Sequence, residues 1–123
     1  MSTLNVSNIS DGTDTVETGY VVNGSAKAWV NFNGTGTIAV RDSLNVASLT
    51  DNGTGDFSAN FNSSYSNTNY VVSMSAASTI ASSDTMANAY SYGTGSVTVG
   101  VNNISGILTD RTYNDITTIG DLA

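Results

Sequence analysis

The 123-residue sequence contains no cysteine, histidine, proline or glutamine, and its only basic side chains are Lys27, Arg41 and Arg111. Without cysteine, neither a disulfide nor a thiolate metal site can stabilise the chain. Without histidine, the commonest general base and the activator of many nucleophilic serines are missing. These absences predict a protein that is not an enzyme and that needs no cofactor.

Small polar residues and glycine make up half of the chain: 15 Asn, 18 Ser, 17 Thr and 12 Gly. Asn, Ser and Thr side chains compete for backbone hydrogen bonds, and glycine is entropically costly in a helix, so this composition disfavours long helices. The net charge is −7. Because phosphate backbones and anionic lipids repel an acidic surface, we expect no nucleic-acid binding and no attraction to an anionic membrane.

The start of the sequence has neither the basic residues nor the apolar stretch of a secretory signal. No apolar run approaches the roughly 20 residues that cross a bilayer, so membrane insertion is not expected. We therefore expect a protein made in a cytoplasm that stays there or leaves it within a larger assembly.

Short segments of alternating apolar and polar residues, separated by Gly, Asn and Asp, recur along the chain, which is typical of antiparallel β-structure. They predict an all-β fold, a small antiparallel β-sandwich or barrel of about eight short strands. Residues 1–20 are expected to form an extended N-terminal arm and linker, with a first strand at 4–9, and residues 21–123 the β-domain. Expected strands of this domain lie within 26–32, 37–44, 44–49, 57–61, 70–76, 86–92, 97–101 and 112–119, with a polar loop at 77–85.

A Gly-Thr-Gly unit occurs three times, at 34–36, 53–55 and 93–95. No helix with a lysine follows any of them, which argues against a phosphate-binding loop. Asn-Gly pairs readily adopt the positive φ angles of tight hairpins, so these units are interpreted as turns. The turn residues are Asn33, Gly34, Gly36, Asn52, Gly53, Gly55, Gly93 and Gly95.

Two groups of side chains are candidates for binding. Asp51 and Asp56 bracket a turn and could offer oxygen ligands to Ca²⁺, but the spacing lacks the order of an EF-hand, and a solvated turn is the simpler interpretation. Trp29 alternates with polar neighbours on its strand, so it marks either a subunit interface or the core, with a sugar platform as a third alternative. The tyrosines Tyr70, Tyr90 and Tyr92 are further candidates for a surface or interface.

Residues 27–37 read Lys-Ala-Trp-Val-Asn-Phe-Asn-Gly-Thr-Gly-Thr. This stretch, followed by Arg-Asp-Ser-Leu-Asn-Val at 41–46 and Thr-Asp-Asn-Gly-Thr-Gly-Asp at 50–56, resembles the C-terminal domain of phage and prophage tail-fibre-type proteins. The resemblance covers residues 26–76. It implies an exterior structural protein of the virion, assembled in the host cytoplasm and trimeric, and it supplies no catalytic residues.

On this interpretation Leu4, Val6 and Ile9 form an anchoring or inter-subunit segment, the alternative being a frayed terminus. The expected partners are further copies in a homotrimer, another virion protein bound through the N-terminal segment, and a host surface glycan. The leading functional hypothesis is a short tail-fibre or spike-type knob that contributes to host recognition. A capsid decoration or head-fibre protein is the close alternative, and a free carbohydrate-binding module is the third.

Overall fold

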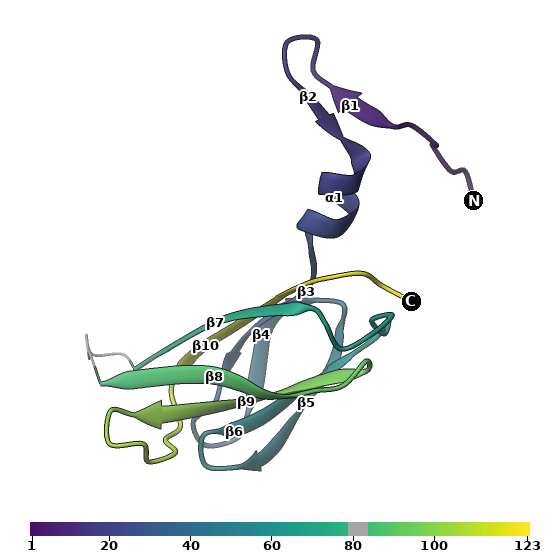
Figure 1. The fold of residues 1–123 in the computed structure, drawn as a ribbon. Coiled ribbons are helices and arrows are strands. Elements are labelled where there is room, and N and C mark those ends of the chain that lie inside the picture. Colours follow the sequence, from purple (N-terminus) through teal and green to yellow (C-terminus); the bar gives the residue numbers. More distant parts are fainter. Residues whose placement is uncertain (79–83) are drawn as a thin grey trace.

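Two four-stranded antiparallel sheets, stacked face to face, form the body of the computed structural model, which describes residues 1–78 and 84–123 (Figure 1). The first sheet has the order β4-β3-β10-β7, with strands Ala39–Leu44, Ala26–Asn33, Tyr113–Ile119 and Val71–Ala77. The second has the order β5-β6-β9-β8, with strands Val46–Gly53, Asp56–Phe61, Ser96–Asn103 and Thr85–Tyr92. The prediction of an all-β sandwich is confirmed.

The core lies between the two sheets and follows the alternation of the sequence. In β3, β6 and β9 every second side chain is buried, because successive residues of a strand point to opposite faces. Phe32 of the first sheet meets Phe57 of the second edge to face, with ring centroids 5.2 Å apart. The buried apolar residues are Ala28, Val30, Phe32, Phe57, Ala59, Phe61, Tyr65, Tyr70, Val97, Val99, Val101 and Ile116.

The three Gly-Thr-Gly units connect consecutive strands, β3 to β4, β5 to β6 and β8 to β9; Gly53 of the second unit is the last residue of β5. Gly55 has φ +66°, and a Cβ added there would come within 2.5 Å of backbone atoms of Thr109 and Val101. Gly34 is also too closely surrounded for a side chain, since a Cβ added there would lie 2.8 Å from the Phe57 ring. These two glycines therefore let a connection pack closely on the sandwich as well as turn the chain.

Residues 1–25 form an arm that leaves the sandwich at the start of β3 and stands away from it (Figure 1). The arm contains a hairpin of β1 (Asn8–Ser10) and β2 (Thr15–Glu17), followed by a short helix, α1 (Thr18–Gly24). The predicted N-terminal arm is present, but the bounds of its strand, predicted at 4–9, are wrong: β1 begins at Asn8 and pairs with β2. The helix spans the boundary expected at residue 20.

The polar loop expected at 77–85 joins β7 to β8, and its residues 79–83 lie outside the described part of the chain. No helix among the described residues is both long and apolar enough to cross a membrane.

Candidate functional site

The hairpin of the arm is held by a turn that Asp11 organises. The Asp11 carboxylate accepts hydrogen bonds of 2.9 Å from the backbone N–H groups of Thr13 and Asp14. The Asp14 and Thr13 N–H groups, in that order, lower the pKa of Asp11 below its usual value. Gly12 has φ +101°, which glycine adopts without strain. The local sequence therefore specifies this turn.

Helix α1 has weak local support. It is seven residues long and contains Gly19 and Gly24, and Glu17 at its N-cap makes no side-chain capping bond. Isolated helices shorter than about 12–15 residues are marginal in water even in alanine-rich sequences. A lone two-stranded hairpin is likewise marginal. The arm therefore needs contacts that its own residues do not provide.

Apolar side chains along the arm face solvent. Tyr20 is 73% exposed, and no residue of α1 is buried. The three predicted anchoring residues occupy different parts of the arm. Leu4, 84% exposed, and Val6 precede the hairpin, whereas Ile9 pairs with Val16 across it. The structure thus divides the predicted segment into a leading part, residues 1–7, and the hairpin and helix, residues 8–24; only the end of the leading part is tied down, because the carbonyls of Val6 and Ser7 accept from Thr18.

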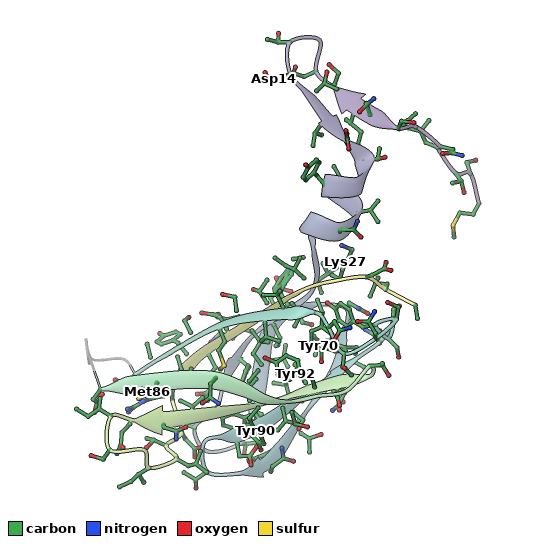
Figure 2. All side chains as sticks on the ribbon, viewed as in Figure 1. Asp14, Lys27, Tyr70, Met86, Tyr90 and Tyr92 are labelled. Atoms are coloured by element: carbon green, nitrogen blue, oxygen red, sulfur yellow. The ribbon has the colours of Figure 1, made fainter. Side chains whose placement is uncertain are left out.

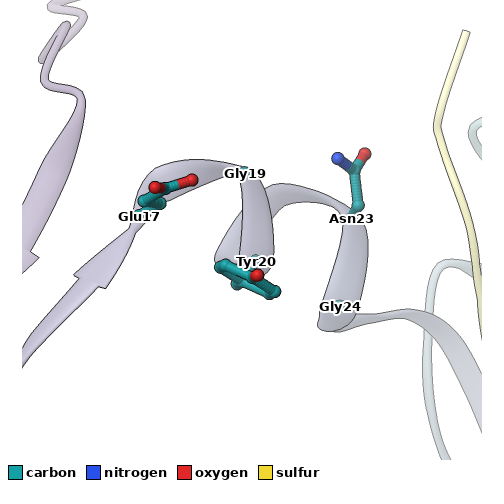
Figure 3. Close-up of a pocket in the computed structure, with 5 residues that line it drawn as sticks. All are labelled: Glu17, Gly19, Tyr20, Asn23 and Gly24. Carbon is teal, nitrogen blue, oxygen red and sulfur yellow. The ribbon is translucent and has the colours of Figure 1, made fainter.

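A pocket lies against α1, and the residues that line it are drawn in Figure 3. Its lining residues are Glu17, Gly19, Tyr20, Asn23 and Gly24. The two glycines leave the helix backbone open beside the Tyr20 ring. The polar groups of this lining are one carboxylate, one phenol and one amide, and they do not pair a nucleophile with a base. An open backbone beside an aromatic ring instead suits contact with the side chain of a protein partner.

The outer face of the first sheet carries the single tryptophan of the chain. Trp29 is half-buried and lies between Leu44 of β4 and Thr117 of β10 in the strand register. It is therefore not part of the core between the sheets, which removes one of the two leading interpretations of this residue. We call this surface the Trp29 face: it consists of Trp29, Asn31, Arg41, Asp42, Leu44, Val71, Ser73, Ser75, Tyr113, Asp115, Thr117 and Ile119.

A row of hydrogen-bonded polar side chains crosses the Trp29 face from β4 to β7. Arg41 donates to the Asn31 amide oxygen at 3.2 Å, and Asn31 in turn donates to Asp115. Asp115 also accepts from the Ser75 hydroxyl at 3.0 Å. These bonds hold the polar groups in fixed positions on a rigid sheet, so little ordering remains for a binding event to impose.

Arg41 takes part in this row because of a β-bulge. The register between β3 and β4 shifts after Asn31, which leaves Arg41 without a partner across the ladder and turns it over the outer face. Its guanidinium lies 4.6 Å from the Tyr113 ring centroid and donates to the Thr112 carbonyl at 2.6 Å. Sequence reasoning missed this row, because strict alternation does not reveal a bulge.

The three candidate tyrosines lie in different surroundings (Figure 2). Tyr70 was predicted at a surface, and this is wrong: it is 5% exposed and stacks on Tyr65. The buried position is possible because its hydroxyl donates to the carbonyls of Gly93 and Ser96. Tyr92 tilts against Tyr70 and is partly exposed.

Tyr90 lies on the outer face of the second sheet. Its hydroxyl donates to the Asp56 carboxylate at 2.7 Å, and this bond raises the pKa of Tyr90. Asp56 also accepts from the amide of Asn52 at 3.3 Å. This face is otherwise a network of short polar side chains, such as the pair of Ser58 and Thr98 with hydroxyls 2.9 Å apart.

The weak Ca²⁺ candidates, Asp51 and Asp56, are each engaged in local hydrogen bonds. Asp51 accepts from the backbone N–H of Gly53 at 3.0 Å, as expected for a turn. Among residues 1–78 and 84–123, no group of three or more acidic, histidine or cysteine side chains is placed to hold a metal ion.

Comparison of the chain with models of protein families, with curated proteins and with solved structures found no match in any of the three.

Proposed function

We propose that this protein is a non-enzymatic structural protein on the exterior of a bacteriophage particle, a short trimeric knob of the tail-fibre or spike type that contributes to recognition of the host surface. The observation that carries the proposal is the division of the chain into a closed sandwich and an arm that stands off it (Figure 1). The sandwich buries all of its apolar core without the arm. The arm is therefore free to attach, while the sandwich is displayed.

The resemblance of residues 26–76 to tail-fibre-type domains gives this arrangement a biological setting. In the proposed particle Leu4 and Val6 engage another virion protein, because they are exposed and lie outside the hairpin. A trimer is in keeping with a chain that has no cysteine to stabilise it, since oligomerisation buries surface that a small β-domain leaves open.

Locating the chain in purified particles tests the proposal. We expect it on the particle exterior in tens of copies, which would place it in the tail. Hundreds of copies would identify the alternative, a capsid decoration or head-fibre protein. Absence from particles, together with binding to soluble glycans, would instead indicate a free carbohydrate-binding module and would refute the virion assignment.

The same material tests the non-enzymatic assignment. We expect no depolymerisation of host surface polysaccharide by the purified protein. Depolymerisation that single Asp→Asn substitutions abolish would contradict the assignment, because it would show a carboxylate-dependent hydrolase.

A further inference from the structure

We propose that the hairpin and helix of the arm, residues 8–24, dock on the Trp29 face of a neighbouring copy of the same chain. This inference rests on the trimer of the proposed function and names the two surfaces that join its subunits. Both surfaces are exposed, and their apolar parts have no covering partner among the described residues of their own chain.

The first argument is residue type. The Trp29 face combines Trp29, Tyr113 and Arg41, the three residue types most enriched at the energetic centres of protein interfaces. Val71 is 63% exposed and Leu44 is 49% exposed on the same face. The outer face of the second sheet exposes Met86 and Tyr90, and the Tyr90 hydroxyl is already bonded to Asp56. Most of its other side chains are short and polar, such as Ser58 and Thr98, whose hydroxyls bond to each other. The two faces differ, and the Trp29 face is the one suited to bury apolar side chains.

The second argument is charge. The arm carries Asp11, Asp14 and Glu17 and no Lys or Arg, so its side chains contribute −3. Residues 26–123 carry seven carboxylates and three cations and contribute −4.

Within the sandwich the cations are unevenly placed. On the Trp29 face and at its base, Arg41 and Lys27 balance Asp42 and Asp115. The other charged side chains of the sandwich, five carboxylates and Arg111, therefore account for its entire net charge of −4. An acidic arm meets least repulsion on the Trp29 face, and least of all if its carboxylates approach Lys27 and Arg41.

The third argument is size. The sheet face measures about 19 by 23 Å, from four strands about 4.8 Å apart and seven residues at about 3.3 Å each. A three-residue hairpin and a seven-residue helix extend about 20 Å in total. An arm about 10 Å wide therefore fits within this face, and each copy makes two such contacts, one through its arm and one through its face.

The fourth argument is symmetry. An arm on one copy and a face on the next form a heterologous contact, which generates a closed ring when the rotation between copies closes. Three such contacts make a trimer in which every arm is covered. Residues 1–7 precede the docked segment and remain available for another virion protein.

Cysteine cross-linking of the full-length chain tests the proposal, because the natural sequence has no cysteine to interfere. Val21 on α1 and Val71 on β7 are exposed apolar positions of the two surfaces. We expect a mixture of the single variants Val21→Cys and Val71→Cys to form a disulfide-linked heterodimer as the main oxidised product. Met86→Cys is the matched control: Met86 is 59% exposed on β8 and lies on the second sheet.

Three outcomes would overturn the proposal. Equal cross-linking of Val21→Cys to Met86→Cys would show non-specific contact. A predominance of Val21→Cys homodimers would show that arms associate with arms. A monomeric mass at all concentrations, with no heterodimer, would show that the chain does not self-associate.

The fluorescence of Trp29 gives an independent measurement, since it reports on this face alone. We expect its emission to shift to the blue as protein concentration rises and the mass increases. Val71→Glu should abolish both changes, and Met86→Glu should preserve them. If emission instead responds only to an added polysaccharide, with dextran and alginate as the neutral and acidic probes, the face is a glycan platform and the proposal fails.

These measurements use the purified chain and need no particle. The expected cross-linking together with absence from virions would refute the proposed function but would still support docking of the arm on the Trp29 face of a neighbouring copy. Presence in virions as a monomer would support the virion location and refute both the trimer and the docking of the arm on a neighbouring copy.

Discussion

The rings of Tyr65 and Tyr70 stack with centroids 4.3 Å apart and an angle of 27° between their planes, at the end of the sandwich where β7 begins. Each hydroxyl has a partner: Tyr65 meets Thr118 at 2.5 Å, and Tyr70 donates to two carbonyls of the turn between β8 and β9. A buried pair of phenols closes this end of the core without histidine, cysteine or proline.

Stability should fall at alkaline pH because of this pair. Burial raises the pKa of Tyr70 to about 12 and also raises the pKa of Tyr65. The folded state then retains a proton on Tyr70 that the unfolded state loses near pH 10. The free energy of unfolding is therefore expected to be unaffected by this group below pH 10 and to decrease between pH 10 and about 12. Urea unfolding at a series of pH values measures this slope.

The variant Tyr70→Phe separates the titration from the packing. It should lower the free energy of unfolding at pH 8 by about 1–3 kcal/mol, because the Gly93 carbonyl loses the tyrosine donor, while the Ser96 carbonyl keeps the bond from the Gly93 N–H. The alkaline slope should become shallower. Tyr20→Phe is the control, since Tyr20 lies on the arm outside the sandwich. An unchanged slope in Tyr70→Phe would refute the role of this phenol.

Gly120 permits the Tyr70 backbone to approach. A Cβ at position 120 would lie 2.5 Å from the Tyr70 Cβ and 3.1 Å from its Cα, atoms that cannot move aside as a flexible side chain would. We expect Gly120→Ala to lower the free energy of unfolding by about 1–3 kcal/mol, the usual cost of overpacking. Gly19→Ala, where the added Cβ meets no atom within 4 Å, is the control and should leave the sandwich unaffected. Equal stability of the two variants would contradict this packing.

Asn114 is a buried polar residue that joins β10 to the chain before it. Its amide N–H donates to the Arg111 carbonyl at 2.8 Å. Asn114→Asp would replace this donor with a carboxylate, so the folded state should hold a proton on the introduced group that the unfolded state loses near pH 4. The free energy of unfolding of this variant should therefore decrease as pH rises from about 4 to 7.

The control for that measurement is Asn88→Asp, because Asn88 is exposed on β8. Denaturant unfolding at pH 4 and pH 7 compares the two variants. A similar pH response in both would show that Asn114 is not held in a protected position.

The core could be predicted because strand side chains alternate. Val97, Val99 and Val101 are buried together, and so are Phe57 and Phe61, as the period of two requires. The order of strands could not be predicted in the same way. β3 and β10 are neighbours although Asn31 and Asp115 are 84 residues apart, and alternation carries no information on pairing over such a separation.

The candidate site was less predictable than the core. Helix α1 has the sequence Thr-Gly-Tyr-Val-Val-Asn-Gly, in which glycine and β-branched residues have low helix propensity, so no local signal indicated it. Arg41 reaches the Trp29 face through a bulge that the apolar pattern does not reveal. Tyr70 can be buried because carbonyls of a distant turn accept a hydrogen bond from its hydroxyl. Only the folded chain brings these groups together.

Deleting residues 1–25 should leave the stability of the isolated sandwich unchanged. All residues of the core lie between Ala28 and Ile116, and the arm contributes none of them. We expect the free energy of unfolding of residues 26–123, measured by urea titration with Trp29 fluorescence at low protein concentration, to agree with that of the dilute full-length chain within about 0.5 kcal/mol. A loss of more than about 1 kcal/mol would mean that the arm packs on its own sandwich. Hydrogen exchange gives a second measurement: amides of α1 should exchange rapidly in the dilute chain, while those of β9 remain protected, because β9 is hydrogen-bonded to β6 and β8 on its two sides and α1 is not part of the core.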